Sequence, residues 1–203
     1  MDGANQKSIQ DTLQYYDRNA REFINNTAAV DFTATQMRFV SKLEKGSHIL
    51  DFGCGSGRDT KYFLSQGFQV TATDGSVELC KLAGEYIGIS VKHMMFQELE
   101  EKKVYDGIWA CSSILHLPLP ELNDVFQRIT AALKKDGVLY TSFKYGNYEG
   151  ERNGRYFTDM TEDRFSDFLK NIKGLELEEQ WVTSDVRPGR GDEKWLNIIL
   201  RKI

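Results

Sequence analysis

The spacing of hydrophobic residues changes along the chain and divides it into expected helices and strands. Near the N-terminus, apolar and aromatic side chains recur every three or four residues, which is the stripe of an amphipathic helix that buries one face. This stripe consists of Ile9, Leu13, Tyr16, Ala20 and Phe23, and it predicts a helix over residues 8–27. A shorter stripe predicts a second helix near residues 33–45.

From residue 48 onward, short apolar runs alternate with helical stretches. Buried strands are expected at His48–Phe52, Gln69–Thr73, Val91–Met95, Gly107–Cys111 and Val138–Phe143. The clearest intervening helix is Glu121–Lys134, and Pro118 and Pro120 suit its beginning, where a missing N–H costs little. Such alternation predicts an α/β fold, a Rossmann-like doubly wound sheet with helices on both faces, whose ligands bind beyond the carboxyl ends of the strands.

The last third of the chain is less regular. Residues 144–157 mix aromatic, basic and glycine residues without a period, and we expect a loop there. Thr161 is a good N-cap for a helix that follows it. Two strand-like runs, Leu175–Thr183 and Trp195–Arg201, close the chain.

Composition and charge narrow the possible functions. The chain has 203 residues, 40% hydrophobic and 28% charged, which is typical of one globular domain. Its net charge of −4 disfavours a nucleic-acid partner, and no apolar run is long enough to suggest a membrane span. The polar N-terminus favours a cytoplasmic location. Three scattered cysteines indicate reduced thiols, and three histidines without metal-binding spacing predict no metal site.

The turn after the first expected strand is the most informative stretch for function. Asp51 precedes three alternating glycines, Gly53, Gly55 and Gly57, which let the backbone turn sharply and approach a ligand. A dinucleotide-binding turn spaces its glycines as GxGxxG and faces an anionic diphosphate. Here the spacing is GxGxG and a carboxylate stands beside it. A ligand with an ammonium and a sulfonium group would gain from that charge.

Asp74 ends the next expected strand, 17 residues beyond Gly57. An acid at this place can accept hydrogen bonds from both hydroxyls of a ribose. The alternative is a turn or helix-capping acid without a ligand. Ser76 is expected to cap the following helix.

These motifs resemble those of class I S-adenosylmethionine-dependent methyltransferases, in order over residues 48–143. Asp51–Gly57 is similar to the family's DxGxGxG motif, and Asp74 stands at its ribose-binding acid. Residues 105–116 resemble the motif on the fourth strand, beside the methyl donor. The whole chain is similar to small bacterial members described as tellurite-resistance-like or trans-aconitate-methyltransferase-like. The resemblance implies a seven-stranded sheet with the last strand antiparallel, S-adenosylmethionine as cofactor and S-adenosylhomocysteine as product.

The resemblance also implies a set of cofactor-binding positions and a division of the chain. The cofactor-binding positions are Tyr16, Asp51, Gly53, Cys54, Gly55, Gly57, Asp74, Gly75, Ser76, Phe96, Gln97 and Ser112. Many members have Asp where Gln97 stands, so the adenine contact is expected from the Gln97 amide or the backbone beside it. Residues 1–203 are expected to form one domain, with an N-terminal helical lid (1–45), a cofactor-binding core (46–145) and an acceptor side (146–203). A helix that merely packs on the core is the alternative to the lid.

The acceptor side offers one possible base and several cations. His116 is the only histidine that follows a core strand, so it is the candidate general base; the alternative is a packing or capping histidine. We expect a small acceptor with a carboxylate or other anionic group, because arginine forks suit such groups. The residues expected to bind it are Lys144, Tyr145, Arg155, Arg187, Arg190 and Trp195. Surface ion pairs with neighbouring acids would explain the same arginines without a ligand.

Three other functions remain open from the sequence. A nicotinamide-dependent oxidoreductase would share the sheet, but the GxGxG spacing argues against it. A non-catalytic protein that binds S-adenosylmethionine is the second. A methyltransferase that acts on a protein or nucleic acid is the third, and the acidic composition and the absence of a DPPY or NPPY motif at residues 110–113 disfavour a nucleic acid.

Overall fold

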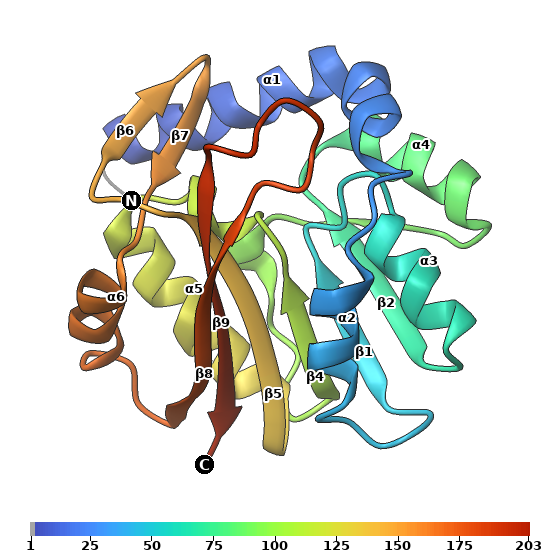
Figure 1. Ribbon diagram of the computed structural model, residues 1–203, viewed down its shortest axis with the longest axis vertical. Coiled ribbons are helices and arrows are strands. Elements are labelled where there is room, and N and C mark those ends of the chain that lie inside the picture. Colours follow the sequence, from blue (N-terminus) through green and yellow to red (C-terminus); the bar gives the residue numbers. More distant parts are fainter. Residues whose placement is uncertain (1–2) are drawn as a thin grey trace.

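The computed structural model describes residues 3–203, and side chains from residue 6 (Figure 1). The helices are α1 (Gly3–Thr27), α2 (Thr33–Val40), α3 (Arg58–Ser65), α4 (Val77–Ile87), α5 (Leu119–Ala132) and α6 (Glu162–Leu169), with short 3-10 turns η1 (Phe96–Glu98) and η2 (Ile114–His116). The strands are β1 (His48–Phe52), β2 (Gln69–Asp74), β3 (Lys92–His93), β4 (Tyr105–Ala110), β5 (Leu133–Lys144), β6 (Glu149–Arg152), β7 (Arg155–Thr158), β8 (Leu175–Ser184) and β9 (Lys194–Lys202).

Seven strands form one sheet in the order β3-β2-β1-β4-β5-β9-β8. The first five run parallel, while β9 lies antiparallel between β5 and β8. The direction of the order reverses between β1 and β4, which is the switch point where such sheets bind ligands. The expected seven-stranded, doubly wound fold with an antiparallel last strand is confirmed.

Helices cover both faces of the sheet, and successive side chains of each strand point to opposite faces (Figure 1). On β4, Ile108 packs in the cluster that α5 and α6 cover, and Trp109 packs in the cluster that α2 and α3 cover. Trp109 stacks on Tyr140 of β5, with ring centroids 3.9 Å apart. Because the central strands are buried on both sides, they read as continuous apolar runs in the sequence.

Two expected helix caps are present. The Ser76 side chain accepts a hydrogen bond from the backbone N–H of Leu79 at the start of α4, at 3.1 Å. Thr161 does the same for Arg164 at the start of α6. Each oxygen satisfies an N–H group that the first turn of a helix leaves without a partner.

Some expected element boundaries and one expected loop differ from the structure. The strand expected at residues 91–95 is reduced to β3, and α2 ends at Val40 rather than near residue 45. The segment expected as a loop contains an antiparallel hairpin, β6–β7, which turns at Asn153 and Gly154. Both residues have positive φ, as a two-residue hairpin turn requires, and Asn-Gly is the sequence signal for that turn. The Asn-Gly pair is present in the sequence, but the residues on either side do not alternate between apolar and polar, so they do not indicate strands.

Candidate active site

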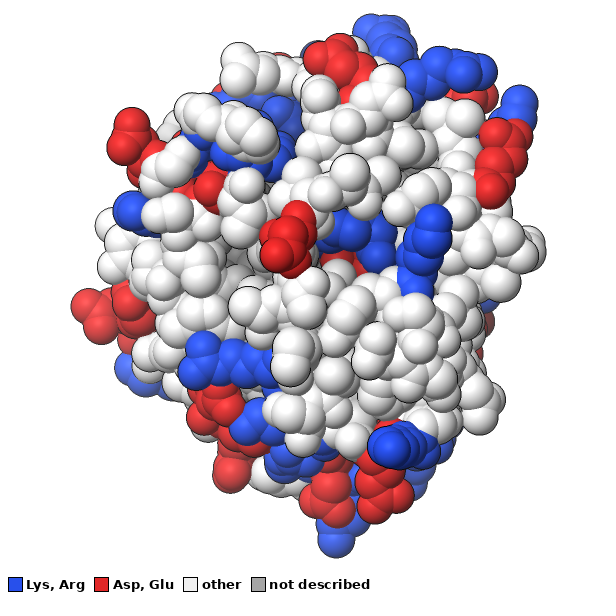
Figure 2. Space-filling model, turned by 45° about the vertical axis from the view of Figure 1, so that its right-hand side comes forward, with Lys and Arg blue, Asp and Glu red and all other residues white. Residues whose placement is uncertain are grey.

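A large cavity lies at the carboxyl ends of the parallel strands, between the sheet and α1. Helix α1 crosses this end of the molecule beside the β6–β7 hairpin and the loop that joins β8 to β9 (Figure 1). The surface drawn in Figure 2 is hollowed, and Lys or Arg atoms are visible inside the hollow and on its rim. The rest of that face mixes both signs of charge and shows no continuous basic band.

The glycine turn forms one wall of this cavity. Gly53 and Gly55 both have positive φ, and a side chain at either would meet a neighbour. A Cβ atom on Gly53 would lie 2.5 Å from Cβ of Ser113, and one on Gly55 would lie 3.0 Å from the ring of Phe23. Glycine is therefore required here for backbone conformation and for close packing.

The Asp74 carboxylate links the glycine turn after β1 to the turn after β2. Its two oxygens accept hydrogen bonds from the backbone N–H groups of Gly55 and Ser76, each at 2.9 Å. Asp74 is buried and lines the cavity, and burial raises the pKa of its carboxyl above the ordinary value. A carboxylate oxygen can accept more than one hydrogen bond, so capacity for a ligand hydroxyl remains.

Asp51 lies beneath the glycine turn and does not line the cavity. Its carboxyl accepts a hydrogen bond from the Thr60 hydroxyl at 2.5 Å. Burial, together with the nearby charge of Asp59, raises the pKa of Asp51 to about 8. Asp59 is equally buried, but its pKa is lowered because the Arg58 guanidinium lies beside it. The Trp109 indole N–H and the Gln36 amide also donate hydrogen bonds to it. The buried pair therefore carries one negative charge, on Asp59.

Replacement of Asp51 by Asn is expected to flatten the pH dependence of stability above neutrality. The pKa of Asp51 in the folded protein exceeds its unfolded value of about 3.9, so the folded protein holds one more proton than the unfolded chain. The free energy of unfolding therefore falls as pH rises, by up to about 1.4 kcal/mol per pH unit between about pH 7 and 8. His116 is neutral in both states in this window. Chemical denaturation of the protein without cofactor should show a gain in stability for Asp51→Asn already at pH 7, because the unfolded wild type is ionised above about pH 4, and this gain should grow by about 1 kcal/mol from pH 7 to pH 8. A large loss at pH 7 would show that the wild-type carboxyl is ionised.

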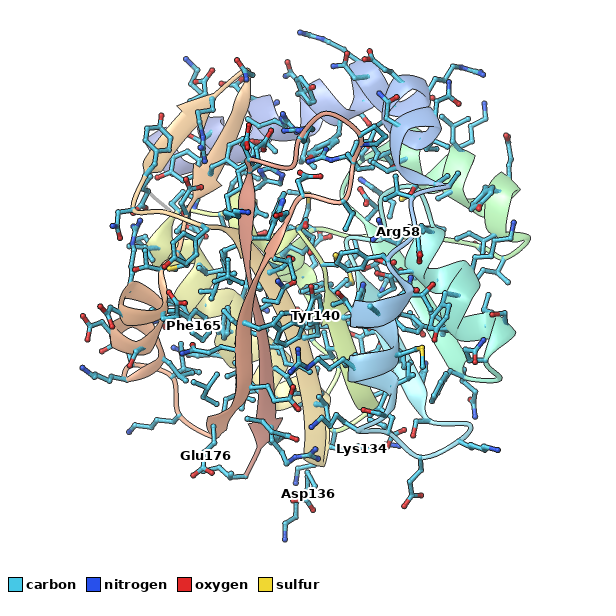
Figure 3. The ribbon with its side chains drawn as sticks, in the orientation of Figure 1. Arg58, Lys134, Asp136, Tyr140, Phe165 and Glu176 are labelled. Carbon is cyan, nitrogen blue, oxygen red and sulfur yellow. The ribbon has the colours of Figure 1, made fainter. Side chains whose placement is uncertain are left out.

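The arginine that neutralises Asp59 also reaches the cavity. Arg58 lines it and packs its guanidinium 4.6 Å from the ring centroid of Phe32. Figure 3 shows Arg58 toward the end of the sheet that α1 covers, with Tyr140 in the middle and Lys134 and Asp136 at the opposite end.

The expected cofactor positions divide into two groups. Those that line the cavity are Tyr16, Gly53, Cys54, Gly55, Asp74, Gly75, Phe96 and Ser112. Asp51, Gly57, Ser76 and Gln97 do not line it. Gln97 has a buried Nε2 group without a hydrogen-bond partner, next to Phe96 on η1. Ser112 has a positive φ of 52°, an uncommon conformation that sits directly after β4.

His116 forms a hydrogen-bonded pair with Tyr16 of α1. Its Nδ1 lies 2.6 Å from the backbone oxygen of Tyr156, so Nδ1 carries the proton and donates it to that oxygen. Its Nε2 therefore accepts the O–H of Tyr16, at 2.8 Å. Burial lowers the pKa of His116 to about 3. The imidazole is neutral at physiological pH and is a weak base.

Most of the expected acceptor-binding residues also come together at the cavity. Lys144, Arg155, Arg187, Arg190 and Trp195 line it, whereas Tyr145 does not and instead donates its hydroxyl proton to Glu162. Sequence analysis did not single out Arg58, although its position directly after the last glycine of the turn could have indicated it.

Helix α1 is fastened over the cavity by contacts along its length. Thr12 accepts the backbone N–H of Tyr156 at 2.9 Å, and Asp17 accepts the Ser76 hydroxyl at 2.6 Å. A Cβ atom on Gly75 would lie 2.8 Å from Leu13, so this side chain rests on the turn after β2. The helix thus closes over both cofactor-side turns.

Comparison with known proteins shows what this arrangement is similar to. Residues 49–137 match the family model described as "Methyltransferase domain". The matched residues make up less than half of the chain, and they include the glycine turn and Asp74. In the solved structure of the 1,6-didemethyltoxoflavin N1-methyltransferase from Burkholderia thailandensis, the fold agrees with a TM-score of 0.80 at 22% identity, covering 98% of this chain and 90% of that one. That structure contains bound S-adenosylhomocysteine, and this chain shares its fold.

Two curated relatives extend the comparison. The ubiquinone biosynthesis O-methyltransferase of Rickettsia akari is 27% identical over 76% of this chain and 62% of its own length. The phosphoethanolamine N-methyltransferase of Plasmodium falciparum is 25% identical over 86% of this chain and 75% of its own length. This chain therefore spans less than two thirds of the Rickettsia relative.

Two further features of the described residues concern membrane-spanning helices and groups of metal-binding side chains. None of the helices in residues 3–203 is both long and apolar enough to cross a membrane. Within the same range, no three His, Cys, Asp or Glu side chains are grouped so that they could hold a metal ion.

Proposed function

We propose that this chain transfers the methyl group of S-adenosylmethionine to a nitrogen or oxygen atom of a small acceptor that carries an anionic group. The observation that carries the proposal is one cavity that joins the glycine turn and Asp74 to the Tyr16–His116 pair and to a cationic wall. The first part suits the methyl donor, and the other two suit an acceptor.

The residues around the two turns fit the donor. Gly53 and Gly55 leave room for a ligand against the backbone, and Asp74 offers acceptors for the ribose hydroxyls. Phe96, which lines the cavity beside the glycine turn, suits contact with the adenine ring. When bound, the donor supplies an electrophilic methyl group on a sulfonium. The protein then has to align the nucleophile with that methyl and to exclude water, and such alignment is worth roughly 7–11 kcal/mol in favourable systems.

The Tyr16–His116 pair is suited to hold the nucleophile. The Tyr156 carbonyl accepts the Nδ1–H of His116 and so sets the orientation of the imidazole. The Nε2 of His116 in turn accepts the Tyr16 O–H. A lone pair of the Tyr16 oxygen can then accept an N–H or O–H of the acceptor. With a pKa of about 3, His116 cannot ionise a weakly acidic alcohol. We therefore infer an acceptor that is nucleophilic near neutral pH without a strong base, such as a neutral amine, whose N–H the Tyr16 oxygen can accept.

An anionic group on the acceptor is supported by the charge of the cavity. Five Lys and Arg side chains line it, against three Asp side chains. Relatives include a phosphoethanolamine N-methyltransferase, whose named substrate joins an amine to a phosphate. The resemblance to tellurite-resistance-like and trans-aconitate-methyltransferase-like enzymes suggests two further acids.

Calorimetry and an acceptor panel test the proposal. Purified protein should bind S-adenosylmethionine and S-adenosylhomocysteine, and should prefer them to NADH. Formation of S-adenosylhomocysteine would then be followed with phosphoethanolamine and trans-aconitate, each beside a neutral analogue. Binding of NADH but of neither sulfur compound would refute the proposal. Binding without turnover on any small molecule, but with turnover on a protein or RNA extract, would refute the acceptor class.

We also propose that α1 acts as a lid over the bound donor. Bound S-adenosylhomocysteine should slow tryptic cleavage of α1 at Arg18 and Arg21 at least tenfold, because opening of the helix would have to break donor contacts. Asp17→Ala should speed cleavage several-fold in the free protein, since it removes the acceptor of the Ser76 hydroxyl. Asp11→Ala, on the same helix, is the matched control. Equal cleavage with and without the ligand would show that α1 is a fixed part of the core.

A further inference from the structure

Arg155 differs from the other cations of the cavity wall. The others are each neutralised by a nearby acid: Arg58 by Asp59, Lys144 and Arg190 by Glu193, and Arg187 by Asp185. Among the side chains that the structure describes, residues 6–203, no acid forms an ion pair with Arg155. From the sequence alone, each of these cations is an equal candidate for binding an anion. The ion pairs in the structure distinguish Arg155 from the others.

The surroundings of Arg155 are aromatic rather than acidic. Its guanidinium carbon lies 4.4 Å from the ring centroid of Tyr15 and 5.2 Å from that of Phe157. Its Nη1 reaches the Tyr16 oxygen at 3.5 Å, a long hydrogen bond. Its Nε is buried and has no hydrogen-bond partner among the residues that the structure describes. A buried donor of a charged group that lacks a partner destabilises the protein unless a ligand supplies the acceptor.

The hairpin increases this cost. Arg152 lies directly opposite Arg155 across β6–β7, and like charges that face each other across two strands destabilise a hairpin. Arg152 is paired with Asp159 and does not line the cavity. Among the cavity cations, Arg155 alone lacks an ion pair with any acid of residues 6–203.

We propose that Arg155 binds the anionic group of the methyl acceptor, a carboxylate or a phosphate, and so makes the site select acids over their neutral analogues. This inference rests on the proposed methyltransferase function and assigns its anion site to one residue. The planar guanidinium presents two parallel N–H groups, which match either anion. The arginines of the β8–β9 loop keep their own acids as partners.

The position of Arg155 also limits the size of the acceptor. The Tyr16 oxygen, which we place against the nucleophile, is 3.5 Å from Arg155 Nη1. Each protein group would hold its ligand atom at about 2.9 Å, so an anionic oxygen bound at Nη1 lies within about 9 Å of the nucleophile. The acceptor is therefore compact, with only a few atoms between the two groups.

Titration with inorganic phosphate and, separately, with acetate tests this assignment. The protein would be saturated with S-adenosylhomocysteine and kept at constant ionic strength, and its arginine Nε–H signals would be followed by NMR. The signal that disappears in Arg155→Lys should shift with at least one of the two anions. Arg155→Gln should weaken binding of that anion at least tenfold. Arg190→Gln, which removes a cavity cation already paired with Glu193, should change it less than threefold.

The outcomes separate this inference from the proposed function. Loss of anion binding in Arg155→Gln, with S-adenosylhomocysteine binding intact, supports the assignment, and the stronger of phosphate and acetate names the group. Anion binding that survives Arg155→Gln and Arg155→Lys, or that disappears only in Arg190→Gln, overturns it while the donor site stands. Failure of the wild type to bind S-adenosylhomocysteine would instead overturn the proposed function.

Discussion

Replacement of His116 by Gln is expected to lower turnover by a factor of roughly 10² or more, with the affinity for S-adenosylhomocysteine unchanged within about threefold. His116 contacts Tyr16 and the Tyr156 carbonyl, and it lies on the acceptor side of the cavity. Its removal frees the Tyr16 hydroxyl to rotate. A nucleophile displaced by about 1 Å from its productive position can cost 10²-fold in rate. Tyr16→Phe should have a comparable effect on kcat, because it removes the oxygen itself.

The pH profile distinguishes this positioning role from general-base catalysis. Because burial lowers the pKa of His116 to about 3, the imidazole stays neutral as pH falls from about 8 to about 5. The kcat of the wild type and that of His116→Gln should therefore depend on pH in the same way near pH 6.5. A limb at that pH, lost in the variant, would establish a titrating base and contradict the burial of this group.

Matched substitutions control for general damage. His48→Gln changes a histidine that pairs with Thr71 away from the cavity, and Tyr86→Phe removes a hydroxyl from the outside of α4. Both variants should keep full turnover. Full turnover in His116→Gln and Tyr16→Phe as well would leave the pair with a packing role only.

Replacement of Asp74 by Ala is expected to weaken binding of S-adenosylmethionine and S-adenosylhomocysteine at least tenfold. The carboxylate accepts the backbone N–H groups of Gly55 and Ser76, and it is the acceptor we assign to the ribose hydroxyls. A hydrogen bond to a charged group contributes about 1.5–3 kcal/mol, and about 1.4 kcal/mol corresponds to one factor of ten in affinity. The loss should appear in Kd by calorimetry and should be similar for both sulfur compounds, which share the ribose.

A second variant keeps this test independent of folding. Asp74→Asn preserves one oxygen acceptor for the turns and should fold more stably than Asp74→Ala, yet it should still weaken binding because the charge is gone. Asp124→Asn, on the exposed side of α5, is the control and should bind as the wild type does. Equal affinity in all four proteins would mean that Asp74 only braces the two turns.

Local patterns predicted those parts of the structure that a short stretch of chain can specify. The amphipathic stripe of α1, the buried strand β1 and the caps at Ser76 and Thr161 each depend on neighbouring residues, and each formed as expected. The hairpin β6–β7 was missed because its signal, Asn153-Gly154, is only two residues long. The end of α5 was misplaced by two residues because β5 begins at Leu133 and pairs with Tyr105 from β4.

The sequence by itself determined the fold class, the glycine turn and most of the residues that gather at the strand ends, because hydrophobic period, glycine spacing and the alternation of elements depend on residues close together in the chain. Only the tertiary structure decided which member of that set is available for chemistry. It buried Asp51 against Thr60, joined His116 to a tyrosine 100 positions away, and gave every cavity cation except Arg155 an acid. The physical reason is that pKa values and ion pairs depend on burial and on contacts between distant segments, and these exist only once the chain has folded.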